Sequence, residues 1–138
     1  MPFEIVTNFL IFVFGVVLAI QDWRYREVHI ILVLGFFASC IFEFMITEVK
    51  FPCLYPFFIF IAVGLIYQLK FHKKAFGLAD YLIAFSISFI LPDNMWPLFL
   101  TVSGVFGVIT GRFYKKDTFP FIPSMMFSLL LTRLIAYY

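Results

Sequence analysis

Charged residues are scarce in this chain of 138 residues. Lys and Arg number 10, Asp and Glu number 8, and charged residues make up 13% of the sequence, against about 25% in a soluble domain. Hydrophobic residues make up 64%, where about 45–50% is usual. So few charges cannot coat a soluble domain, and a composition this apolar excludes disordered and collagen-like chains. The sequence predicts a protein that resides in lipid.

Metal-binding and nucleic-acid-binding patterns are also lacking. Cys40 and Cys53 do not form a CxxC pair, and His29 and His72 would need further Cys, His or carboxylate ligands converging with them to bind a metal ion. The basic residues lie in short loops rather than along one stripe, so nucleic acid is not an expected partner. We therefore expect no metal site.

Long apolar runs dominate the rest of the sequence. A bilayer core of about 30 Å requires roughly 20 apolar residues per helix. The candidate spans are residues 3–20, 28–46, 52–69, 78–91, 96–111 and 119–137. The runs are continuous rather than alternating, which favours helices over the strands of a membrane barrel. The predicted fold is all-α, an integral membrane bundle of six transmembrane helices forming a single domain over residues 1–138.

The distribution of basic residues predicts the orientation of these spans. The first, third and fifth loops carry Arg24, Arg26, Lys70, Lys73, Lys74, Arg112, Lys115 and Lys116. The opposite side has Lys50 and Arg133. Because Lys and Arg accumulate in cytoplasmic loops, we expect the odd-numbered loops to face the cytoplasm. Both termini of this multi-pass cell membrane protein are then extracytoplasmic.

Acidic residues inside or beside the spans need an explanation, since burying a carboxylate in lipid is costly. Glu4, Glu48, Asp93 and Asp117 fall in predicted termini or loops, where solvation is expected. Glu43 lies near the outer end of the second span. We expect Glu43 either to reach the interface or to pair with Arg133.

Asp22 and Asp80 are placed differently. Asp22 follows the first span and Asp80 lies in the first turn of the fourth, which puts both at the same cytoplasmic depth. If they meet laterally, one carboxyl group would hold a proton while the other stays ionised, and such a pair can activate water and protonate a leaving amine. On residue type alone, interfacial or N-capping roles are the more common explanation.

The surrounding residues carry a resemblance. The run DWRYREVHI, which begins at Asp22, resembles the D-x-R-x-R-x-I-P-N signature of type IV prepilin peptidases, with Arg26 as its second arginine. The run FGLAD, which ends at Asp80, resembles the GxGD element of that family: Gly77 is its first glycine, and Ala79 replaces the second. The run FPFIPS is similar to the start of the family's last helix.

The resemblance implies a function. Asp22 and Asp80 would be the catalytic residues of an aspartyl endopeptidase that removes the basic leader from prepilin or pilin-like precursors at the cytoplasmic face, with no cofactor or metal. His29 and Ile30 replace the usual Pro-Asn, which puts the local turn in question. The N-terminal extension with paired CxxC motifs found in larger members is not expected here, so methyltransferase activity is not implied.

Two other functions remain open on the sequence. In the first, Asp22 and Asp80 bind a cation or relay protons in a small channel or transporter. In the second, the chain is a noncatalytic member of the resembled family, for which Ala79 is the one departure that gives support.

Overall fold

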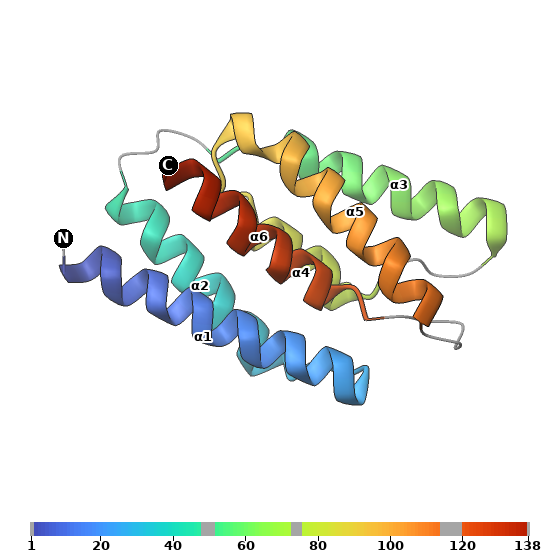
Figure 1. Ribbon diagram of the computed structural model, residues 1–138, viewed down its shortest axis with the longest axis horizontal. Helices are drawn as coiled ribbons and strands as arrows, with labels where there is room; N and C mark the ends of the chain where they lie inside the picture. The colour runs from blue at the N-terminus through green and yellow to red at the C-terminus, as the bar shows by residue number, and fades with distance from the viewer. Residues whose placement is uncertain (1, 48–51, 73–75, 114–119, 138) are drawn as a thin grey trace.

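The computed structural model describes residues 2–47, 52–72, 76–113 and 120–137. The fold that these residues form is all-α, as predicted (Figure 1). Within them the chain forms six α-helices and one short 3₁₀ turn, η1. The elements are α1 (Pro2–Tyr25), α2 (Ile30–Ile46), α3 (Tyr55–Phe71), α4 (Leu78–Ile87), η1 (Asp93–Met95), α5 (Trp96–Phe113) and α6 (Ile122–Tyr137).

The helices differ from the predicted spans mainly in length. Among the described residues, Phe3–Tyr25 and Asp93–Phe113 are long and apolar enough to cross a membrane, and the other four helices are shorter but apolar. Helix α1 continues five residues past the predicted end and therefore includes Asp22. Helix α4 ends at Ile87 because the next residues form tighter turns, in which Phe89 and Ile90 donate to carbonyls three residues back.

Four helices form the centre of the bundle. Helix α1 packs against α2, α2 against α4, α4 against α6, and α6 against α1 (Figure 1). Helix α5 packs on the outside of α6, and α3 packs on the outside of α4. Helices α1 and α4, which carry Asp22 and Asp80, therefore occupy opposite corners of a four-helix core.

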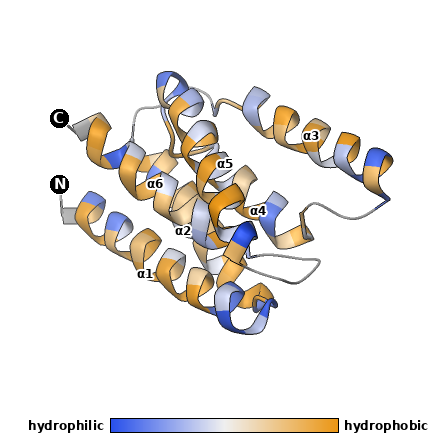
Figure 2. Cartoon of the chain, turned by 45° about the vertical axis from the view of Figure 1, so that its right-hand side comes forward, coloured by the Kyte–Doolittle hydropathy of each residue, from blue (hydrophilic) through white to orange (hydrophobic). Residues whose placement is uncertain are grey.

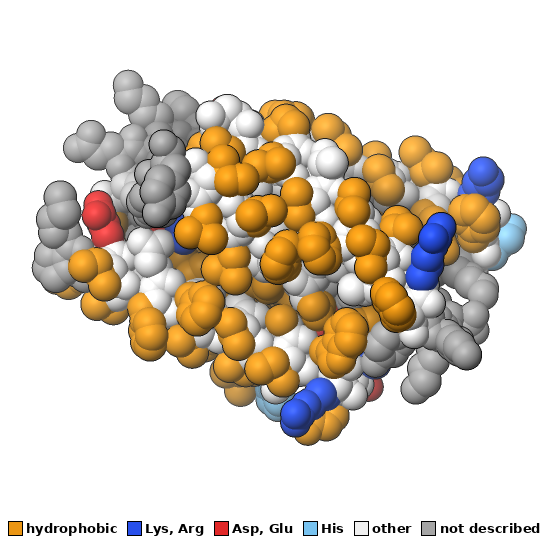
Figure 3. All heavy atoms as spheres, viewed as in Figure 1, with side chains coloured by type: hydrophobic (Ala, Val, Ile, Leu, Met, Phe, Trp, Pro, Cys, Tyr) orange, Lys and Arg blue, Asp and Glu red, His pale blue; other side chains and the backbone are white. Residues whose placement is uncertain are grey.

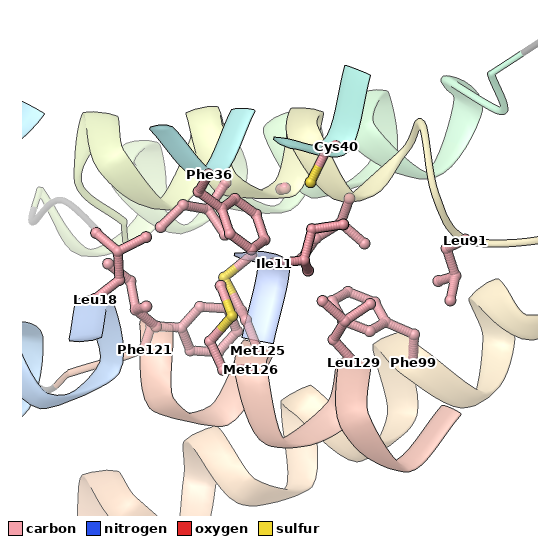
Figure 4. Packing of buried hydrophobic residues seen from close by; sticks show 14 of the residues in the cluster. Ile11, Leu18, Phe36, Cys40, Leu91, Phe99, Phe121, Met125, Met126 and Leu129 are labelled. Carbon is pink, nitrogen blue, oxygen red and sulfur yellow. The ribbon is translucent and has the colours of Figure 1, made fainter. Parts of the chain in front are cut away.

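The core is apolar and so is most of the outer surface. Met125, Met126 and Leu129 of α6 pack among side chains from the neighbouring helices in the buried cluster (Figure 4). Hydrophobic residues cover most of each helix, and hydrophilic ones gather at helix ends (Figure 2). One face of the molecule is largely hydrophobic, with Lys and Arg side chains at its edges (Figure 3). A hydrophobic exterior around a hydrophobic core suits lipid rather than water.

Successive helices run in opposite directions, so the last residues of α1, α3 and α5 lie at the same end of the bundle as the first residues of α2, α4 and α6 (Figure 1). We call this the site end of the bundle. Arg24, Lys70 and Arg112 belong to the last turns of α1, α3 and α5 and therefore lie there. Some residues of the predicted charge asymmetry, loops and last span lie outside the described residues: Glu48, Lys50, Lys73, Lys74, Lys115, Lys116, Asp117 and Phe119.

A buried ion pair lies toward the opposite end. Arg133 of α6 donates hydrogen bonds to Glu43 Oε1 of α2 and, at 2.7 Å, to Asn8 Oδ1 of α1. The side chains of Glu43 and Arg133 are only 8% and 17% exposed. Of the two positions expected for Glu43, the pairing with Arg133 is confirmed, and it links three helices of the core.

Candidate functional site

Asp22 lies in the last turn of α1 and contacts the start of α6. Its Oδ2 accepts a hydrogen bond from the backbone N–H of Ile122 at 3.0 Å. Ile122 is the first residue of α6, where backbone N–H groups have no partner within the helix and the helix dipole favours a negative charge. Asp22 therefore fixes the start of α6 against the end of α1. The last helix begins inside the FPFIPS run, close to its predicted start.

Asp80 is the third residue of α4 and forms a reciprocal cap with Gly77. Its Oδ2 accepts a hydrogen bond from the Gly77 N–H at 2.7 Å, and its own N–H donates to the Gly77 carbonyl at 3.1 Å. Gly77 has a φ of −81°, and Ala79 lies within the helix. Neither position needs the left-handed backbone that favours glycine, so the structure accommodates Ala79 without backbone strain.

The fold brings the two aspartates together at the site end. Asp22 is close enough to Asp80 for their charges to interact, and the guanidinium of Arg26 is within electrostatic range of both carboxyl groups. Both side chains are half-buried. Each aspartate thus has the capping role expected from residue type, and each also belongs to a pair of neighbouring carboxyl groups.

Hydrogen bonds from two backbone N–H groups close the turn after α1. Arg26 has a φ of +61°, a conformation uncommon for residues other than glycine, and its N–H donates to the Asp22 carbonyl at 3.1 Å. The His29 N–H donates to Gln21 Oε1 at 3.1 Å. Proline has no N–H, so the histidine at this position provides a hydrogen bond that the usual Pro-Asn could not. The replacement of proline by His29 therefore adds a hydrogen bond to the turn.

Several contributors to the site are not among the predicted residues. Gln21 and the N–H of Ile122 hold the Asp22 side of the site, and Tyr81 packs its hydroxyl against Gly64 of α3. A polar Gln beside Asp22 in an apolar helix was the one available sequence signal. Backbone donors and the contact between Tyr81 and Gly64 depend on tertiary packing, which composition and periodicity do not reveal.

We expect Gly64→Ala to destabilise the protein by about 1–3 kcal/mol, because overpacking a close contact forces side chains or backbone to shift. A Cβ at Gly64 would overlap the Tyr81 hydroxyl oxygen. Gly104→Ala is the matched control, since a Cβ there meets no described atom within 4 Å. The free energy of unfolding in detergent should fall for the first variant and stay level or rise slightly for the second. Equal stability of the two variants would contradict the close contact.

No group of three or more His, Cys, Asp or Glu residues within the described part of the chain is arranged to hold a metal ion. Cys40 is buried and Cys53 is half-buried, and both are free thiols.

Comparison with known proteins gives a family match. Residues 9–112 match the sequence model of the type IV leader peptidase family. A prepilin leader peptidase/N-methyltransferase from Haemophilus influenzae is 27% identical over 126 residues, which cover 85% of this chain and 55% of that protein. The chain thus spans about half the length of this curated relative. No solved structure matches this chain significantly.

Proposed function

Because the chain belongs to the type IV leader peptidase family, we propose that it is a membrane-embedded aspartyl endopeptidase. Its substrates are prepilin or pilin-like precursors, in which a short basic leader precedes a hydrophobic helix. Asp22 and Asp80 are the catalytic residues, with Gly77, Ala79 and Arg26 as supporting residues of their motifs. The observation that carries the proposal is that the two aspartates lie at one end of the bundle within electrostatic range of each other, each held by a backbone N–H.

The chemistry follows from two neighbouring carboxyl groups. Like charges a few ångströms apart disfavour double ionisation, so one carboxyl group is protonated while the other is ionised. The ionised group takes a proton from water, whose oxygen attacks the scissile carbonyl carbon. The protonated group gives its proton to the leaving amine as the C–N bond breaks. One water is consumed, and the two products are the leader with a new carboxyl end and the subunit with a new amino end.

The site end is proposed to face the cytoplasm, with both termini on the other side. Arg24, Lys70 and Arg112 all lie at the site end, in agreement with the accumulation of Lys and Arg in cytoplasmic loops. This orientation places the carboxyl pair on the side where the leader of a newly made precursor is found. The proposal covers peptide-bond cleavage alone and includes no methyl transfer.

The direct test is cleavage by the purified chain in lipid vesicles. The probe is a synthetic precursor with a basic leader followed by a hydrophobic helix, and the products are identified by mass spectrometry. We expect one cut near the leader–helix junction. Since the proposed chemistry uses water and two carboxyl groups, metal chelators should leave the rate unchanged. An intact precursor, together with a cation or proton flux that depends on Asp22 and Asp80, would overturn the proposal in favour of a channel or transporter.

A further inference from the structure

Aromatic residues lie next to the backbone groups that hold the two catalytic aspartates. Phe76 precedes Gly77, whose N–H binds Asp80, and Phe121 precedes Ile122, whose N–H binds Asp22. The ring centroids of Phe76 and Phe121 lie 4.9 Å apart. A direct side-chain contact therefore joins the two turns that fix the aspartates, although these turns belong to different helices.

Helix α3 supports this contact from outside. Its Phe60 stacks on Phe76 with ring centroids 4.3 Å apart and lies 5.8 Å from Phe121. Tyr81 lies edge-on to Phe60 at 5.6 Å. We call these four rings the aromatic cluster. Phe60 and Phe121 are both buried, so the cluster is packed as part of the core and not as a free surface for substrate.

We propose that Phe76 and Phe121 are positioning residues that set the separation and orientation of Asp22 and Asp80. This inference rests on the proposed function. The hydrogen bonds from Gly77 and Ile122 measure 2.7 and 3.0 Å, so a shift of either turn carries its aspartate with it. Catalysis by a carboxyl pair depends on placement, and a displacement of roughly 1 Å can lower a rate about 100-fold.

The test compares Phe76→Leu and Phe121→Leu with a matched control in the cleavage assay described above. Phe106 and Phe127 form another close ring contact, between α5 and α6, with centroids 4.3 Å apart. Phe106→Leu therefore removes a comparable contact without touching either aspartate turn. We expect kcat to fall by about 10- to 100-fold for the first two variants, with KM little changed. For Phe106→Leu, kcat should stay close to the wild-type value.

Two further variants separate positioning from general loss of packing. Phe76→Tyr keeps the ring and should restore most of kcat. The double variant F76L/F121L should be no slower than the slower single variant, because both substitutions remove the same contact. If Phe76→Leu does not fold, Phe76→Met keeps a side chain of similar volume without the ring, and the same loss of kcat is expected.

Several results would overturn the inference. Equal loss of kcat in Phe76→Leu and Phe106→Leu would show that ring contacts matter only for stability. A loss confined to KM would place the cluster in substrate binding, and independent, multiplicative effects in the double variant would exclude a shared contact. In each case the wild-type chain still cleaves its substrate, and the proposed function stands. If the wild-type chain cleaves nothing, the proposed function fails and the positioning role fails with it.

Discussion

Asp80→Asn and Asp22→Asn are each expected to lower the rate of leader cleavage by about 10²–10⁴-fold, the usual contribution of a general acid or base. The amide has nearly the same shape as the carboxyl group and its oxygen can still accept the N–H of Gly77 or Ile122. The folded bundle should therefore remain, while the proton transfer that the proposed mechanism assigns to the carboxyl group is lost. Initial rates of product formation, measured beside the melting temperature in detergent, separate the two effects.

Asp93→Asn is the matched control for these variants. Asp93 begins η1, the turn between α4 and α5, and is exposed at the end of the bundle away from the carboxyl pair. Its substitution removes the same charge but touches neither aspartate, so the cleavage rate should stay normal. A normal rate in either Asp22→Asn or Asp80→Asn would refute the two-carboxyl mechanism.

Arg133→Met is expected to give the largest change in stability, a loss of about 3–5 kcal/mol in the free energy of unfolding. The substitution leaves the buried Glu43 carboxyl group and the Asn8 amide without their shared donor. Removing one member of a buried ion pair is costly because the remaining charge has no compensation. Unfolding in mixed micelles of increasing denaturing detergent measures the effect.

A double substitution distinguishes loss of the pair from loss of packing. Glu43→Leu together with Arg133→Met replaces both charges by apolar side chains, so most of the lost stability should return. Arg112→Met removes an exposed arginine from the last turn of α5 and should change stability little. If Arg133→Met is no less stable than Arg112→Met, the ion pair does not stabilise the bundle.

The number and type of elements could be predicted from the sequence because long apolar runs and turn residues depend on local chain properties. The residues at which helices end were harder to predict. Helix α1 runs on to Tyr25 because Gln21 and Asp22 have tertiary partners at His29 and Ile122. Helix α4 stops early where its backbone turns tighten before Pro92. Both differences arise from interactions that hydropathy does not encode.

The sequence marks the acids of the proposed site but not the scaffold that holds them. Asp22 and Asp80 stand out because carboxylates are rare in an apolar chain, and their depth follows from the direction of each helix. Their lateral approach depends on three-dimensional packing, because α1 and α4 face each other across the core and both contact α2 and α6. The same holds for the contact between Phe76 and Phe121, since 22 phenylalanines give no sequence signal that marks these two.

The shortness of α4 has a consequence for the lipid around it. Ten helical residues cover about 15 Å, half of a hydrocarbon core of about 30 Å. Such a mismatch is relieved when the adjoining bilayer thins or when neighbouring helices shield the helix. Helices α2, α3 and α6 all pack against α4 and shield much of it, so local thinning is left for the lipid that meets the rest of this region. Bilayer thickness thereby becomes a physical variable that acts on the helix carrying Asp80.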